Sequence, residues 1–209
     1  MTIPTLMTKH QHKVNVIKWR KAYSQFSQAA LMMSQDYNTS DFKEVLFANI
    51  TQKDSGNVTT NAVIDLFSKY FKNVKANCNG NCNGRNGWNC SGILSDNYEK
   101  TGKTGYKYLN GTDAGYWVLG YYPTACFQTP DFVFGIDTNT TLYGRISIDV
   151  NGIKPPNVIG KDIFVLNMNN LSNVVPGGGE NFYSGFDYEC DENAKSGGPA
   201  CSAKYLISY

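Results

Sequence analysis

The stretch that decides the fold runs from residue 14 to residue 37 and reads VNVIKWRKAYSQFSQAALMMSQDY. No Gly or Pro interrupts it. Apolar residues recur at steps of three and four, which places them on one face of a helix. These residues are Val16, Trp19, Tyr23, Phe26, Ala30, Met33 and Tyr37. The stretch therefore predicts one long helix facing a core, and its spacing also permits a helix–helix seam with another subunit.

Further helices are predicted on the C-terminal side of this stretch. The polar run from Asn38 to Asp41 breaks the first helix and is suited to cap a short helix over residues 42–50. A third apolar stripe predicts a helix over residues 60–74. The segment 77–92, NCNGNCNGRNGWNCSG, predicts neither helix nor strand, because Asn-Gly steps favour tight turns.

After about residue 106 the pattern changes to one of strands. Short runs rich in aromatic and β-branched residues are separated by turn signals such as Asn110-Gly111 and Asn151-Gly152. The runs cover residues 116–119, 125–128, 132–136, 142–150 and 163–168. Short strands without intervening helices favour an antiparallel sheet. The remainder, residues 173–209, reads as irregular and Gly-rich. The predicted fold class is α+β, with the long N-terminal helix packed on an antiparallel β-sheet and loops stapled by disulfides.

Length and composition favour one globular domain spanning residues 1–209. We divide it into the helix (1–37), a helical and Cys-rich insertion (38–105), and the sheet with a C-terminal disulfide loop (106–209). Charged residues make up 17% of the chain, below the average near 25%, and the net charge is +2. No nucleic-acid partner is expected from such a balance. The basic cluster between Lys9 and Lys21 is either a solvated helix face or a contact for anionic lipid or a partner subunit.

Six cysteines form an even set in Asn- and Gly-rich surroundings: Cys78, Cys82, Cys90, Cys126, Cys190 and Cys201. Disulfides would need an oxidising compartment, whereas a zinc site would need paired short spacings that the Cys78–Cys90 cluster lacks. Disulfides are the favoured interpretation, with zinc and free thiols as alternatives. Cys190 and Cys201 are the favoured pair, because a loop containing Gly and Pro joins them.

The sequence shows no recognisable catalytic set. The two histidines, His10 and His12, lie near the N-terminus, where they are poorly placed to activate a fixed nucleophile. The carboxylates at positions 187, 189, 191 and 192 are typical of a polar loop. No enzyme activity and no organic cofactor are expected.

One oxygen-rich stretch is a candidate calcium site. Asp149, Asn151 and Asp162 supply carboxylate and amide oxygens, which are the ligands that calcium prefers, and Gly152 allows a sharp turn. No Glu follows at the twelfth position of a calcium-binding loop. The alternative is that these side chains only hydrogen-bond the turn.

Two segments resemble the prepilin-type family of type IV pilins and type II secretion pseudopilins. Residues 2–6, TIPTL, followed by the polar helix with WRKAYSQFSQA at 19–29, are similar to the region just after the membrane segment of those proteins. Residues 149–164, from Asp-Val-Asn-Gly to Asp-Ile-Phe, are similar to a β-region of bacterial pilin-like proteins. The loop from Cys190 to Cys201 resembles the disulfide-bounded loop of type IV pilins.

The resemblance implies a structural role without catalysis. Such subunits sit in the inner membrane through an apolar N-terminal helix, are cleaved and methylated, and then assemble into a helical filament with other pilin-like subunits. The apolar segment is missing from this sequence and would precede Ile3. Trp19, Tyr23, Phe26 and Met33 would be the packing residues of the subunit, gripping the sheet, while the opposite basic face would meet neighbouring subunits. The protein would be exported, first to the inner membrane and periplasm and then to the pilus or cell surface.

A secreted adhesive or carbohydrate-binding module is the alternative. Aromatic residues in loops carry it: Trp88 in the cysteine cluster, and Tyr183, Phe186 and Tyr188 near the C-terminus. Aromatic faces bind sugars, but they also pack under Gly-rich loops. A DNA-uptake pilin is not favoured, because the net charge is near neutral.

Overall fold

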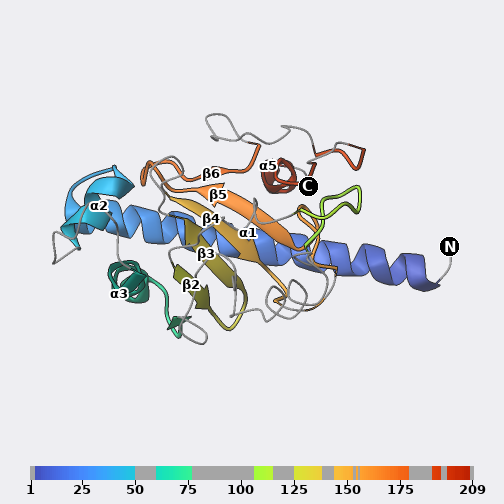
Figure 1. The fold of residues 1–209 in the computed structure, drawn as a ribbon, viewed down its shortest axis with the longest axis horizontal. Coiled ribbons are helices and arrows are strands. Elements are labelled where there is room, and N and C mark those ends of the chain that lie inside the picture. Colours follow the sequence, from blue (N-terminus) through green and yellow to red (C-terminus); the bar gives the residue numbers. More distant parts are fainter. Residues whose placement is uncertain are drawn as a thin grey trace.

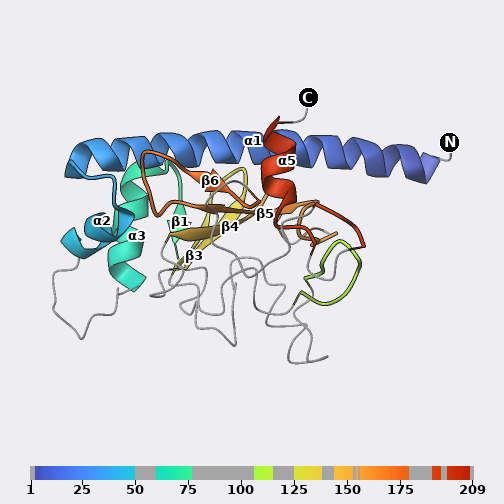
Figure 2. The ribbon, with the colours of Figure 1, turned by 90° about the horizontal axis from the view of Figure 1, so that it is seen from above.

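The computed structural model describes residues 3–49, 60–76, 106–114, 125–137, 144–152, 154, 156–178, 190–193 and 197–207. A long helix, α1 (Ile3–Tyr37), lies along one side of an antiparallel sheet, which confirms the predicted α+β class (Figure 1). Two shorter helices, α2 (Phe42–Ala48) and α3 (Thr60–Tyr70), lie near the C-terminal end of α1. A last helix, α5 (Cys201–Ile207), lies beside the middle of α1 (Figure 2).

The two ends of α1 follow from local rules. Pro4 lies in the first turn, where its missing N–H would have no helical partner in any case. At the other end, Asn38 adopts a positive φ of 51°, and its N–H donates to the carbonyl of Gln35. The N–H of Thr39 donates to the carbonyl of Ser34, which completes a Schellman cap. The chain then turns into α2, whose N-cap Asp41 accepts a 2.8 Å hydrogen bond from the N–H of Lys43.

The six described strands run in sequential order, and each is antiparallel to the next. They are β1 (Lys75–Ala76), β2 (Ala125–Gln128), β3 (Val133–Asp137), β4 (Arg145–Asp149), β5 (Ile163–Asn167) and β6 (Val175–Pro176). The sequence predicted the middle four of these strands. It missed the two-residue edge strands, and its run 116–119 lies outside the described residues.

Two predictions at the ends of elements were wrong. The third helix ends at Tyr70 rather than at residue 74, because Asn73 takes a positive φ of 55° and the chain then pairs with β2. The C-terminal region, predicted to be irregular, contains β6 and α5. Both elements are too short for a periodic pattern of apolar residues to be recognised in the sequence.

Both faces of the sheet are covered. On the α1 side, alternate residues such as Ile146, Ile148 and Phe164 join one large core with α1, α2 and α3. On the other face, Ile163 and Val165 pack with Tyr106 in a smaller cluster. Residues of all three predicted parts of the chain therefore contribute to the main core.

Aromatic side chains fill the space between α1 and the sheet. The ring of Trp19 stacks on that of Phe164 with centroids 5.0 Å apart, and the ring of Phe26 meets that of Phe134 edge-on at 5.0 Å. Such pairs contribute beyond their buried area. This packing fixes the rotation of α1 about its own axis, and so determines which of its faces points away from the sheet.

Candidate functional site

The apolar stripe of α1 packs against other parts of the same chain. Trp19, Phe26 and Met33 have 0% exposure, and Tyr23 is partly buried against the same core. The hydroxyl of Tyr23 also donates a 2.8 Å hydrogen bond to the carbonyl of Val174. These four residues therefore pack in the core of their own chain, on the side of α1 that faces the sheet.

The opposite face of α1 carries exposed apolar side chains. Ile17 is 66% exposed, Leu31 53% and Met32 43%. Leu31 and Met32 follow Ile17 by close to four turns of roughly 3.6 residues each, so the three lie within one arc of the helix. The rest of the chain therefore leaves these three side chains largely open to solvent. We call Ile17, Leu31 and Met32 the outer stripe.

Charged groups flank the outer stripe and are engaged with the sheet side. The ammonium of Lys21 forms a 2.7 Å ion pair with Asp131, and both side chains are about half exposed. Arg20 donates from Nε to the carbonyl of Tyr205 at 2.8 Å. The predicted basic face is thus partly used within the chain, and Lys21 stays about half exposed beside the outer stripe.

A disulfide joins Cys190 to Cys201, the first residue of α5. Cys190 and Cys201, the pair favoured by the sequence, are bonded and lie 11 positions apart. Cys126 is buried in β2. Cys78, Cys82 and Cys90 lie outside the described residues, as do the aromatic residues Trp88, Tyr183, Phe186 and Tyr188 of the adhesive interpretation.

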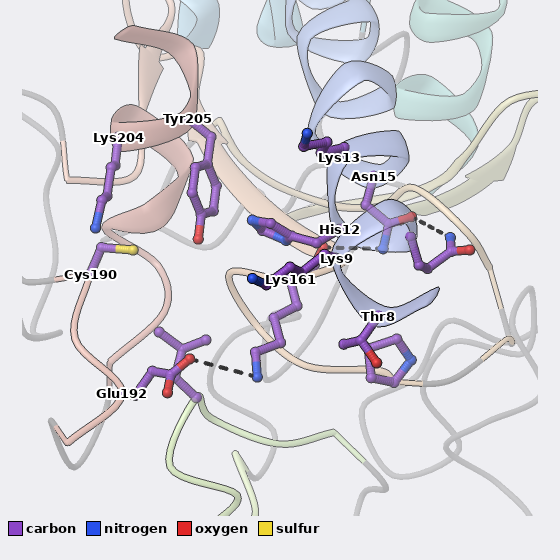
Figure 3. A pocket seen from close by; sticks show the side chains of 13 residues that line it. Thr8, Lys9, His12, Lys13, Asn15, Lys161, Cys190, Glu192, Lys204 and Tyr205 are labelled. Atoms are coloured by element: carbon purple, nitrogen blue, oxygen red, sulfur yellow. Dashed lines mark hydrogen bonds and ion pairs between the residues drawn. The ribbon is translucent and has the colours of Figure 1, made fainter. Parts of the chain in front are cut away.

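A pocket of about 800 Å³ lies between the N-terminal half of α1, α5 and the disulfide (Figure 3). The ring of His12 meets that of Tyr205 edge-on at 5.0 Å, and its pKa is lowered by burial and by the nearby charge of Lys161. Lys161 also lies 3.9 Å from Glu192. Lysines outnumber acids around the pocket, with Lys9, Lys13 and Lys204 also on its wall. The lining suits an anionic group better than a cation.

The structure describes the surroundings of several residues that the sequence analysis weighed for catalysis. The ring of His12 contacts that of Tyr205, and the sulfur of Cys190 on the pocket wall is held in the disulfide. Asp191 accepts hydrogen bonds from Asn193 in its own turn. Asp187 and Glu189 lie outside the described residues.

The oxygen-rich residues of the calcium prediction come together between β4 and β5. Asp149 ends β4, and its Oδ1 accepts the N–H of Asn151 at 3.0 Å. The amide Nδ2 of Asn151 donates to Oδ2 of Asp162 at 3.0 Å. Asp162 further accepts the N–H groups of Asn157 at 2.8 Å and Val158 at 2.7 Å. The three predicted residues thus form one hydrogen-bonded cluster.

Burial dominates the electrostatics of this cluster. It raises the pKa of Asp149 well above its ordinary value, and the neighbouring Asp162 carboxylate raises it further. Burial also raises the pKa of Asp162, against the opposing effect of the hydrogen bonds that it accepts. Among the described residues, no group of three or more His, Cys, Asp or Glu side chains is placed to hold a metal ion. Any cation here would need amide and backbone oxygens besides the two carboxylates.

Membrane-spanning helices and similarity to known proteins were both looked for in this chain. Of the helices described, none is both long and apolar enough to cross a bilayer. No protein-family model, curated protein or solved structure matches the chain.

Proposed function

We propose that this chain is a structural subunit, a pilin or pseudopilin, of a helical filament of the type IV pilus or type II secretion kind. The architecture of α1 supports this most strongly. One face of the 35-residue helix packs in the chain's own core, while the three apolar side chains of the outer stripe are 43% to 66% exposed. A helix of this kind is suited to pack against further copies.

The N-terminal turns of α1 add to this argument. They extend beyond the sheet and the other helices in both views (Figure 1). Thr8, Lys9, His10 and Gln11 are all exposed, so these turns gain little from the core of the chain. In the proposed subunit an apolar segment precedes Ile3, inserts into the inner membrane, and later bundles with the same segment of its neighbours. Neither catalysis nor a nucleic-acid partner belongs to this role.

The experiment follows the protein to the cell surface. In bacteria that carry the gene, filaments are sheared from the surface, pelleted and probed for this chain. Wild-type protein is expected in the pellet. Leu31→Asp is expected to lower its amount roughly tenfold or more, because an unpaired charge in an apolar contact costs more than about 1.4 kcal/mol.

A matched control separates assembly from folding. Thr112→Asp places the same charge on an exposed residue of another segment and should leave the pelleted amount unchanged. The melting temperature of each purified variant shows that the fold is intact. If the chain instead accumulates as free protein in the medium, and Leu31→Asp changes nothing, the secreted binding module becomes the better interpretation.

A further inference from the structure

The pocket between α1, α5 and the disulfide gathers positive charge. Its wall includes four lysines: Lys9, Lys13, Lys161 and Lys204. Among the described residues of the wall, Glu192 is the one acid. The whole chain has 19 Lys and Arg residues against 17 Asp and Glu residues, so the excess at the pocket is local. Like charges that are gathered in one place repel each other, and a bound anion would offset this repulsion.

The charges lie on two sides of the pocket. Figure 3 shows Lys204 and Tyr205 of α5 on one side. On the other side lie His12 and Lys9 of α1, together with Lys161 from the turn before β5. The two walls come from distant parts of the sequence, so the pocket exists only in the folded chain.

Specific contacts hold both walls in place. Asn15 of α1 is buried, and its Nδ2 donates a 3.2 Å hydrogen bond to the backbone carbonyl of Lys161. This bond fixes the turn before β5 to the long helix. The disulfide between Cys190 and Cys201 fixes the start of α5 to the segment beside it. Binding would therefore not have to order the backbone of these walls, which lowers its entropic cost.

The single acid leaves much of this charge uncompensated. Oε1 of Glu192 lies 3.9 Å from Nζ of Lys161, and the two side chains are 75% and 41% exposed. Such an exposed ion pair contributes little. Burial, and after it the charge of Lys161, lower the pKa of His12, so the positive potential of this wall reaches the imidazole. An anion with more than one negative charge would compete well with Glu192 for the Lys161 ammonium.

We propose that this pocket binds an organic phosphate. The phosphate group would contact the ammonium groups of Lys9 and Lys161, and the organic part would lie against the ring of Tyr205. The same phosphate chemistry occurs in soluble esters and in lipid head groups, and the experiment below distinguishes these two sources. This inference does not depend on the proposed filament.

The side chains on the wall favour a phosphate ester over other anions. Lysine offers a compact charge on a flexible stem and binds phosphate well, whereas arginine matches planar carboxylates, and none of the described lining residues is Arg. The wall also has an apolar part, formed by Leu109, Pro156 and Tyr205. A volume of about 800 Å³ is typical of sites for organic ligands and is far larger than an inorganic ion needs.

Titrations of the full chain with soluble and lipid probes test the proposal. Glycerol phosphate, inorganic phosphate and succinate are titrated calorimetrically at low salt. Co-sedimentation measures binding to phosphatidylcholine vesicles with and without phosphatidylglycerol. Tighter binding of glycerol phosphate than of the other two anions supports a soluble ester, and binding only to vesicles that contain phosphatidylglycerol supports a lipid head group. No binding of glycerol phosphate and none to either vesicle would overturn the proposal, as would equal affinities for glycerol phosphate and succinate.

Lysine variants test the two ammonium contacts. Lys9→Gln combined with Lys161→Gln should weaken binding roughly tenfold or more, because it removes two charge-assisted contacts. Lys43→Gln combined with Lys72→Gln is the matched control, since it changes the net charge equally at two exposed lysines outside the pocket. The control should keep the wild-type affinity, and melting temperatures show that both variants are folded. Equal affinities for the two double variants would contradict the assignment of these lysines.

A change of the opposite sign locates the site further. Glu192→Gln removes the acid of the wall and should tighten binding roughly twofold to fivefold. Asp65→Asn removes the same charge from an exposed position of α3 and should leave the affinity unchanged. In nuclear magnetic resonance spectra, the ring signals of His12 should move on titration more than those of His10, which is exposed and does not line the pocket. Equal shifts at the two histidines, or weaker binding by Glu192→Gln, would contradict binding in this pocket.

Discussion

The indole Nε1 of Trp19 in α1 donates a buried 3.0 Å hydrogen bond to the backbone carbonyl of Ser202 in α5. The hydroxyl Oγ of Ser202 in turn accepts the N–H of Val165 in β5 at 3.0 Å. Residues 183 positions apart are thus connected, and the two helices are fixed to the same strand. This chain of hydrogen bonds holds the C-terminal helix on the long helix.

Removing the indole donor should destabilise the fold. Trp19→Phe can keep a ring on Phe164 but leaves the carbonyl of Ser202 without its partner, and we expect a loss of about 1–3 kcal/mol in the free energy of unfolding. Urea denaturation followed by circular dichroism measures it. Tyr23→Phe is the control, because it removes a bond to Val174 that is only partly buried. A Trp19→Phe loss no larger than that of the control would contradict the role given to the Trp19–Ser202 bond.

The disulfide should contribute stability of its own. Replacing both Cys190 and Cys201 by Ala opens a short loop, and the expected loss is about 2–4 kcal/mol. Substitution is preferable to a reductant here, since a reductant would also reach the other cysteines of the sequence. Denaturation midpoints that agree between the double variant and the wild type would show that the hydrogen bonds alone hold α5.

A pair of glycines tests how closely the segment before α5 approaches the β4–β5 loop. Gly160 and Gly111 have nearly equal positive φ values of 84° and 83°. A Cβ at Gly160 would lie 2.8 Å from the carbonyl oxygen of Gly198 and 2.9 Å from Sγ of Cys201, whereas a Cβ at Gly111 meets nothing within 4 Å. Gly160→Ala should lower the free energy of unfolding by about 1–3 kcal/mol more than Gly111→Ala. Both substitutions place a Cβ on a backbone with positive φ, but only the Cβ at position 160 clashes with neighbouring atoms. Equal costs from thermal unfolding would refute the close approach.

The long helix and the central strands could be predicted from the sequence because their signal is periodic and local. Trp19, Phe26 and Met33 recur at helical spacing, and all three are buried. The short helix α5 could not be predicted in this way. Its position depends on the disulfide and on contacts with Trp19 and Val165, which are distant in sequence.

The candidate sites were predictable to different degrees. Asp149, Asn151 and Asp162 were identified from residue chemistry, and the structure brings them together. The contribution of Asn157 was missed, because its positive φ and the burial of its Oδ1 depend on the folded turn. The outer stripe was missed as well, since an apolar residue such as Ile17 can be recognised as exposed only once the orientation of α1 is fixed by its aromatic contacts.

The most direct test of the filament proposal is site-specific photo-crosslinking from the outer stripe. A photoreactive phenylalanine analogue replaces Leu31 in the full-length protein expressed in its bacterium, and the cells are irradiated before the surface fraction is analysed. We expect a ladder of covalent multimers that contain this chain alone or with another pilin-like subunit, and none when the analogue replaces exposed Thr112. Only monomers from both positions, with the protein abundant at the surface, would contradict packing of α1 against neighbouring subunits.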